Sequence, residues 1–332
     1  MNAIELDKRI KALTEREQFY LDNPEALSPL YEKFETTDID GNSVYHFRIP
    51  ELSENEVQIR RDSRFRPVPL HRFSNIMINY VYSGKCRYLI NDKIVEMEVG
   101  DVCIIDQDVV RYKFELEADD IVFNISLDKK FFSRFIQHNL SESSIVSSFI
   151  LNSLYSQGKH DQFIFFRNHQ NPRIINLFDE ILTEYYKQQK YYKSTIKSYI
   201  EIVVLEQLRS YQNSDIVLHL PDQKENDFVE ILRDIENNYK EGNIEDLANK
   251  FHYNPKYLSS LIKKRTGFTF KEIQRKTRLD VSCQLLINSS MTIEEIIEEV
   301  GFTNQTSFYN YFKTAYRVSP SEYRKSYDIL KS

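Results

Sequence analysis

The sequence predicts an α+β protein of several domains: an amino-terminal antiparallel β-barrel with a helical hairpin, and an all-α carboxy-terminal domain with two helix-turn-helix units. Three observations carry this prediction. Short β-rich runs fill residues 41–127, apolar residues recur at helical spacing over residues 128–212, and one helix-turn-helix pattern occurs twice after residue 228. With 332 residues, the chain is long enough for two or three domains that each bury a core.

Residues 1–40 are expected to form a helical lead-in that packs on the next domain. Their apolar side chains lie roughly on one helical stripe: Ile4, Leu6, Ile10, Leu13 and Tyr20. Pro24 and Pro29 interrupt the helix afterwards. The first residues carry charges without an apolar run after them, so we expect no signal peptide, and no later stretch is long enough to span a membrane.

Residues 41–127 are expected to form a β-barrel domain. The β-rich runs are short, and turn signals separate them at Gly41-Asn42, Ser83-Gly84 and Gly100-Asp101. Many short strands at even spacing are typical of an antiparallel barrel or a jelly roll.

Residues 128–212 return to a helical period. Two apolar stripes are present, and they comprise Ile174, Leu177, Phe178, Ile181, Leu182 and Tyr185, then Ile196, Tyr199, Ile200, Val203 and Leu208. A polar stretch at residues 187–190 joins them, which predicts an antiparallel helix hairpin. The hairpin either covers the barrel or pairs with a second subunit, and we favour a dimerisation element. Residues 213–227 are polar and read as a linker.

One helix-turn-helix pattern occurs at residues 244–264 and again at residues 293–313. Its apolar positions recur 49 residues later before the turn and 50 residues later after it, so the second turn is longer by one residue. These positions are Ile244, Leu247, Ala248, Phe251, Tyr253, Leu258 and Ile262 in the first copy, and Ile293, Ile296, Ile297, Val300, Phe302, Phe308 and Phe312 in the second. Two such units can present two reading helices to one face of DNA.

The charge of the chain is unevenly distributed. The overall formal charge of -6 does not indicate general nucleic-acid binding. From Lys256 to Arg278, however, eight basic residues and one acid give a local charge of +7. A bounded basic stretch is typical of a phosphate contact surface, although a solvated helix face has the same composition.

The second helix of each copy supplies the candidate DNA contacts. Its apolar side chains are expected to face the core, and they are Tyr257, Leu258, Leu261 and Ile262, then Phe308, Tyr311 and Phe312. The candidate contacts are the polar side chains that remain: Lys256, Ser259, Ser260, Lys263 and Lys264 in the first copy, and Gln305, Thr306, Ser307, Asn310 and Lys313 in the second. Amides and hydroxyls can bond base edges, whereas lysines near the end of each helix suit phosphates.

Several short motifs occur together in the carboxy-terminal domain, residues 228–332. They include Leu247-Ala248, His252-Tyr-Asn-Pro-Lys-Tyr-Leu-Ser259, Lys263-Lys264, Thr266-Gly267, Gly301-Phe302, Phe312-Lys313 and Ser319-Pro320. With these motifs, residues 228–327 resemble the DNA-binding domain of AraC-family transcription regulators. The resemblance implies seven helices, of which a long one from about Lys271 to Asn288 holds two reading helices in successive major grooves about 34 Å apart. The chain departs from the family at Ser260 and Asn310, where arginine is common, and at Arg317, where glycine is frequent.

The runs Asn79–Gly84 and Val99–Ile105 resemble the cupin-type effector domain usual in this family. The resemblance implies a small molecule, most commonly a sugar, inside the barrel. Arg66 and His71 precede the first long strand and are the candidate ligand-binding residues, with solvated rim residues as the alternative. Metal-dependent cupin enzymes need several histidines and a carboxylate in the barrel, whereas His71 is nearly alone, so we expect no metal, no cofactor and no enzymatic activity.

These features predict a sequence-specific DNA-binding transcription regulator, an activator rather than a repressor, that responds to a small-molecule effector. Its expected partners are double-stranded promoter DNA, RNA polymerase, the effector and a second copy of the chain. Alternatively, the barrel is a protein-interaction or structural module, or the chain is a cupin-type enzyme. The cysteines (Cys86, Cys103 and Cys283) lack metal-type spacing, and we expect small buried thiols in a reducing cytoplasm in preference to a redox pair.

Overall fold

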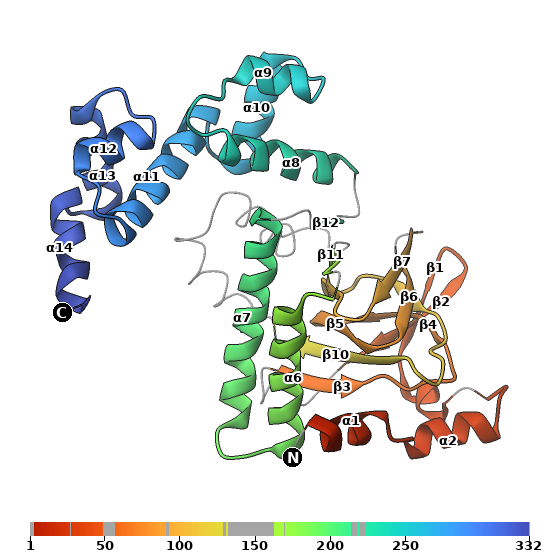
Figure 1. Ribbon diagram of the computed structural model, residues 1–332. Coiled ribbons are helices and arrows are strands. Elements are labelled where there is room, and N and C mark those ends of the chain that lie inside the picture. The colour runs from red at the N-terminus through yellow and green to blue at the C-terminus, as the bar shows by residue number, and fades with distance from the viewer. Residues whose placement is uncertain are drawn as a thin grey trace. The chain divides into compact units, whose positions relative to one another are not determined.

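The computed structural model describes residues 3–26, 28–48, 57–90, 93–128, 131, 163–168, 170–213, 218–219 and 223–331. These residues form two compact units, one that ends at Asn226 and one that begins at Asp227 (Figure 1). Each unit has an apolar core of its own. None of the helices in these ranges combines the length and the apolar composition needed to cross a membrane.

The amino-terminal unit begins with α1 (Ala3–Lys11), α2 (Glu15–Asp22) and the 3-10 helix η1 (Pro29–Lys33). Thr14 and Glu17 form a capping box at the start of α2, in which each side chain accepts a bond from the other's backbone N–H. Glu17 is fully buried and also forms ion pairs with Arg61 and Arg64. Burial opposes its ionisation, but bonds from Arg64 and Thr14 lower the pKa of Glu17 to about 2. The buried carboxylate therefore anchors α2 to the chain segment that holds Arg61 and Arg64.

The strands of this unit form two six-stranded sheets. In chain order they are β1 (Thr36–Ile39), β2 (Asn42–Phe47), β3 (Val57–Arg61), β4 (Val68–Phe73), β5 (Ile76–Ser83), β6 (Lys85–Ile90), β7 (Lys93–Glu98), β8 (Val102–Ile105), β9 (Arg111–Lys113), β10 (Ile121–Leu127), β11 (Phe163–Phe166) and β12 (Leu218–His219). The first sheet has the order β1-β2-β4-β9-β6-β7, and the second has the order β12-β11-β8-β5-β10-β3.

The α+β class and the cupin-like antiparallel sheets are confirmed, with three differences from the sequence prediction. The sheets are not closed into one barrel, and β2 pairs with β4 in parallel. In addition, β11 lies within the range expected to be helical. Its four residues, Phe163–Phe166, are all buried and pair with β8, and such a short apolar run has no period by which a strand differs from a buried helix.

The main core of this unit follows from strand alternation. In β6, Cys86, Tyr88 and Ile90 are buried, whereas Lys85 and Arg87 point to solvent. By contrast, β5 and β8 carry long runs of consecutive buried residues, which requires a cover on their second face. The three cysteines are free and buried, as expected for small apolar thiols.

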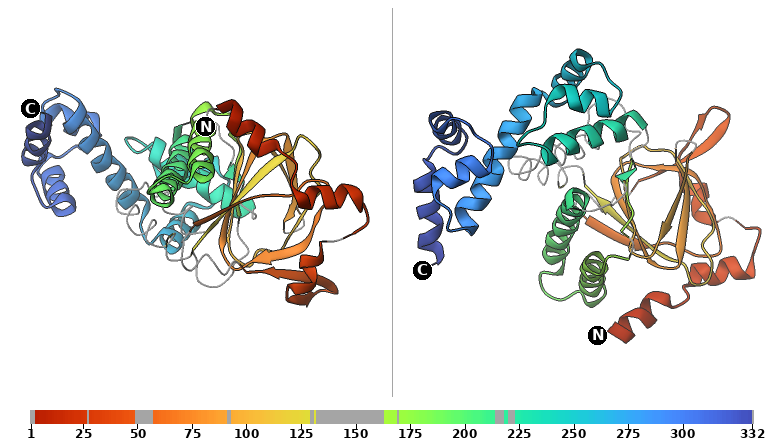
Figure 2. Two further views of the ribbon diagram at one scale, coloured as in Figure 1. Left: turned by 90° about the horizontal axis from the view of Figure 1, so that it is seen from below. Right: turned by 45° about the horizontal axis from the view of Figure 1, so that its top comes forward.

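That cover is supplied by the antiparallel hairpin of α6 (Pro172–Lys187) and α7 (Tyr192–Asn213), which lie side by side in Figure 2. The ring of Phe178 on α6 stacks on that of Tyr80 on β5, with centroids 3.7 Å apart and planes at 4°. Ile196, Ile200 and Val203 of α7 are buried as well. The apolar stripes of the hairpin are thus used within the chain itself.

The carboxy-terminal residues 223–331 are all described and form seven helices, the number that the family resemblance implied. They are α8 (Gln223–Asn237), α9 (Ile244–Lys250), α10 (Pro255–Thr266), α11 (Phe270–Asn288), α12 (Ile293–Glu299), α13 (Gln305–Tyr316) and α14 (Pro320–Lys331). α11 runs between two groups of helices, with α9 and α10 near one end and α12 and α13 near the other (Figure 1).

Candidate functional site

The first helix-turn-helix unit consists of α9 and α10. Asn254 caps α10 by accepting bonds from the backbone N–H groups of Lys256 and Tyr257, and Pro255 occupies the first helical position. Ala248 on α9 and Leu258 on α10 have no exposed surface, and this contact packs the two helices against each other. The cap and this contact fix the start and the rotation of α10.

The second unit consists of α12 and α13 and is built in the same way. Thr292 and Glu295 form a capping box at the start of α12, and Asn304 caps α13 through the backbone N–H of Ser307. Phe308 and Phe312 of α13 are fully buried in the core of this half. Their rings form an aromatic cluster with neighbours from the turn before α13, from α13 itself and from α14, which fixes the face that α13 turns outward.

The turn between the helices has the same hydrogen bonds in both units. Tyr253 N–H donates to the Ala248 carbonyl at 2.8 Å, and Phe302 N–H donates to the Ile297 carbonyl at 3.0 Å. The residue before each of these donors is in the left-handed region, with φ of 58° at His252 and 80° at Gly301. The repeat seen in the sequence is therefore a repeat of backbone conformation.

Nine of the ten candidate DNA contacts lie on exposed surface. They are Lys256, Ser259, Ser260, Lys263 and Lys264 on α10, and Gln305, Thr306, Asn310 and Lys313 on α13. Ser307, the tenth, is partly buried. The Gln305 amide donates to a Glu294 carboxylate oxygen at 3.1 Å, so it must exchange that partner to reach a base.

Two aromatic residues expected in the core are instead exposed. Tyr257 is 57% exposed and stacks on Tyr253, and Tyr311 is 40% exposed with the Arg275 guanidinium over its ring at 4.3 Å. Both lie at the edge of the apolar stripe, where a large ring can pack on a neighbour while one face stays in water. Thr314, at the position 50 residues after Lys264, is also exposed and was not among the candidates.

The loop after α8 joins the connecting helix α11 to the second helix-turn-helix unit. Arg278 of α11 donates to the backbone carbonyls of Tyr239 at 3.0 Å and Lys240 at 2.7 Å. Lys240 also forms an ion pair with Glu299 of α12, and its backbone lies against Gly301. One loop therefore contacts both the connecting helix and the second helix-turn-helix unit.

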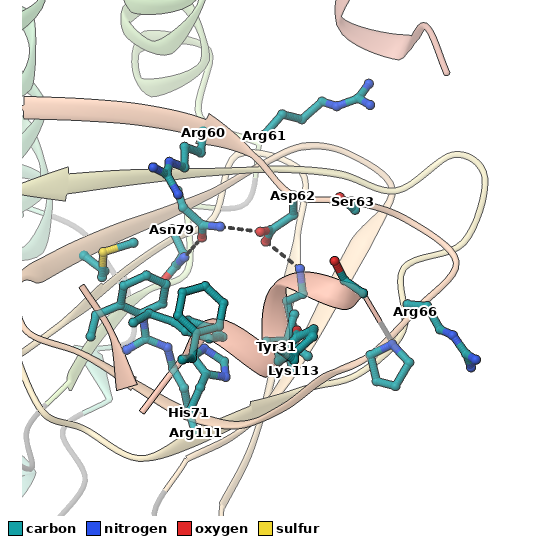
Figure 3. Close-up of a pocket in the computed structure, with 18 of the residues that line it drawn as sticks. Tyr31, Arg60, Arg61, Asp62, Ser63, Arg66, His71, Asn79, Arg111 and Lys113 are labelled. Atoms are coloured by element: carbon teal, nitrogen blue, oxygen red, sulfur yellow. Dashed lines mark hydrogen bonds and ion pairs between the residues drawn. The ribbon is translucent and has the colours of Figure 1, made fainter. Parts of the chain in front are cut away.

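A second candidate site lies in the amino-terminal unit, where a cavity of about 200 Å³ opens between the two sheets (Figure 3). Both ligand candidates predicted from the sequence line it. The Arg66 guanidinium donates to the Ala26 carbonyl at 3.1 Å, which orients it at the cavity wall. His71 is 3% exposed and is therefore not a solvated rim residue.

His71 is held as a neutral imidazole. Burial and the adjacent Arg111 lower the pKa of His71 well below its usual range. Its ring stacks on Phe47 at 5.0 Å, and its Nδ1 lies 2.7 Å from the Pro69 carbonyl. A neutral ring donates from Nδ1 to that carbonyl, so Nε2 can only accept. Within the described parts of the chain, no group of three or more His, Cys, Asp or Glu side chains is placed to bind a metal ion.

Comparison with known proteins relates the carboxy-terminal unit to transcription regulators. A family model described as a helix-turn-helix domain matches residues 247–326. The chain is 35% identical over 127 residues to the Transposon Tn10 TetD protein of Escherichia coli, a match that covers 37% of this chain and 92% of that protein.

Longer similarities are weaker. The chain is 23% identical over 246 residues to the uncharacterized HTH-type transcriptional regulator YtdP of Bacillus subtilis, covering 66% of this chain and 31% of the relative, so it spans about a third of that protein's length. A solved structure of ToxT from Vibrio cholerae with a bound unsaturated fatty acid is similar at 18% identity and a TM-score of 0.33, covering 81% of this chain and 94% of that one.

Proposed function

Because the chain belongs to the AraC family of transcription regulators, we propose that α10 and α13 enter successive major grooves of promoter DNA under the control of a small molecule. The observation that carries this proposal is the matched outer face of the two helices. Lys256, Ser260 and Lys263 of α10 are exposed at the same register as Thr306, Asn310 and Lys313 of α13. Polar side chains in this pattern suit base edges near the centre and phosphates near the end.

The separation of the two helices supports binding in neighbouring grooves. α11 has 19 residues and is therefore about 28 Å long, at roughly 1.5 Å per residue. Successive major grooves on one face of DNA are about 34 Å apart. The bonds from Arg278 hold the connecting helix to the loop after α8.

Selection of bound sequences from a random DNA pool with the full chain tests the proposal. We expect footprints with two contacted segments whose centres are about 10 base pairs apart. Ser260→Ala should relax base preference in one segment, and Asn310→Ala in the other, each by roughly 1–3 kcal/mol of discrimination at one base pair. A footprint with a single contacted segment would exclude two reading helices.

The effector proposal rests on the cavity of the amino-terminal unit. Its wall combines aromatic rings with charged and polar side chains, the mixture typical of a small-molecule site. We further propose that the chain acts as an activator through RNA polymerase. Reporter transcription with purified polymerase measures this directly, and lower transcription on adding the regulator would contradict it.

We also propose that the chain pairs with a second copy through the outer side of α7. Ile202 on that helix is 38% exposed, whereas Ile200 is buried and supports the fold. Ile202→Glu should therefore yield monomers by light scattering with an unchanged melting temperature. A dimer that persists in this variant would rule out this face.

A further inference from the structure

The cavity between the two sheets carries a large excess of positive charge. Among the described residues that line it are six arginines and one lysine, but one acid, Asp62. Two of the arginines have carboxylate partners outside the lining, since Arg61 pairs with Glu17 and Arg48 pairs with Glu35. Of the other cations, Arg16 and Arg60 are exposed and Arg66 is half-buried, whereas Arg111 and Lys113 are buried and form the inner wall.

Arg111 is the most unusual of these side chains. It lies on β9 with 1% of its surface exposed, and its guanidinium carbon is 4.9 Å from the centre of the Phe73 ring. Its Nη1 is buried and has no hydrogen-bond partner among the residues that the structure describes. A buried cationic donor without an acceptor is costly, so it indicates a position at which an acceptor from outside the chain is favourable.

Asp62, the one acid among the described lining residues, forms no ion pair with Arg111. The Asp62 carboxylate lies 2.6 Å from Lys113 Nζ, and its other oxygen accepts a bond from Asn124 (Figure 3). His71 is neutral, and burial lowers the pKa of Arg111 only to about 10, so the guanidinium stays charged at neutral pH. The inner wall therefore keeps an uncompensated positive charge beside aromatic rings.

We propose that this cavity binds a small organic anion whose carboxylate or phosphate group accepts hydrogen bonds from Arg111, while its body packs against Phe47 and Phe73. The inference deepens the effector proposal and replaces the neutral sugar expected from the family. Guanidinium groups bind both kinds of oxyanion with paired hydrogen bonds. A cavity of about 200 Å³ restricts the ligand to a small acid.

Binding of charged and neutral probe pairs to the full chain tests the proposal. The probes are benzoate against benzamide for a carboxylate, and glucose 6-phosphate against glucose for a phosphate, measured by thermal shift and by calorimetry. At least one anion should raise the melting temperature while its neutral counterpart does not, and the responding pair identifies the anionic group. Equal shifts from both members of a pair, or no shift from any probe, would overturn the proposal.

Arg111→Met separates a ligand-binding arginine from a structural one. It should weaken anion binding roughly 10- to 100-fold, the loss expected for a charge-assisted hydrogen bond. Because the charge it removes forms no ion pair with a described carboxylate, the melting temperature of the free variant should stay the same or rise. If Arg111→Met folds poorly, Arg111→Lys is the second variant to test. It keeps the positive charge and should therefore retain part of the anion binding.

Arg87→Met is the matched control. Arg87 also lies over a phenylalanine ring, with its guanidinium carbon 4.4 Å from the Phe114 centroid, but it is exposed and outside the cavity lining. Anion binding should be unchanged in this variant. Because the variants at Arg111 leave α10 and α13 intact, DNA binding measured on the same preparations shows whether a failure concerns the anion alone or the regulator as well.

Discussion

The first and second helix-turn-helix units follow similar chain paths, yet they differ in the residue at the two points where that path needs a positive φ. In the turn, the first unit has His252 at φ 58° and the second has Gly301 at φ 80°. At the end of the reading helix the choice is reversed, with Gly267 at φ 79° and Arg317 at φ 64°. The shared hydrogen bonds and core contacts are therefore strong enough to hold a side chain in the left-handed region, and each unit bears that strain at a different point.

The two reading helices also differ in charge. The outer face of α10 carries Lys256, Lys263 and Lys264, whereas that of α13 carries Lys313 with uncharged neighbours. Phosphate contacts supply affinity without sequence information, and uncharged donors and acceptors supply discrimination at base edges. The comparison indicates that the first helix-turn-helix unit contributes more of the affinity for phosphates, whereas binding by the second depends more on the base sequence.

The largest expected effect concerns this division of charge. Lys263→Ala with Lys264→Ala should reduce the slope of log affinity against log salt by about 1.8, at roughly 0.9 per phosphate contact. The matched pair at the same register, Lys313→Ala with Thr314→Ala, should reduce it by about 0.9. Titration of a selected site at several salt concentrations measures both. Equal reductions would show that the two helices share the phosphate contacts evenly.

The turn residues provide an intermediate effect. Gly301→Ala places a methyl group about 3.4 Å from the Lys240 backbone at a left-handed position, so it should destabilise the second unit by roughly 1–2 kcal/mol. His252→Gly removes backbone strain from the folded state but increases the conformational entropy of the unfolded chain. The two changes oppose each other, so the free energy of unfolding should change by less than about 0.5 kcal/mol. Hydrogen exchange of the helix amides in the full chain measures each unit separately. A larger loss at His252 would show that its imidazole makes a contact the backbone does not require.

Much of the carboxy-terminal unit could be predicted from the sequence because its contacts are periodic and local. Leu258, Ile262, Phe308 and Phe312 are buried as their spacing predicts, and the caps at the reading helices lie next to the helices they cap. The prediction that Tyr257 faces the core is wrong. A ring at the edge of an apolar stripe can lie in the core or at the surface, and the local sequence pattern does not distinguish the two.

The sequence could not predict the contacts that join distant segments. Arg278 donates to carbonyls 38 and 39 residues away, and a backbone carbonyl has no sequence signature. Arg111 on β9 and Asp62, which directly follows β3 of the other sheet, line the same cavity, so neither the excess charge nor its missing partner follows from any single strand. His71 was identified as a candidate, but its neutral state depends on burial beside Arg111.

The smallest expected effect lies at the ends of the reading helices. Arg317 is exposed, and its backbone N–H donates to the Lys313 carbonyl at 2.9 Å, as Gly267 N–H does to the Lys263 carbonyl. Arg317→Gly should therefore keep the cap and remove strain, stabilising α13 by about 0.5–1 kcal/mol. Gly267→Ala should cost α10 about the same amount, since a Cβ there meets no atom within 4 Å and only the backbone is strained. Slower hydrogen exchange in the last turn of α13, with faster exchange in the last turn of α10, is the expected pattern. If Arg317→Gly instead destabilises α13 or lowers DNA affinity, the guanidinium itself makes a contact that offsets the strain, and the second unit is less dependent on uncharged readers than its outer face indicates.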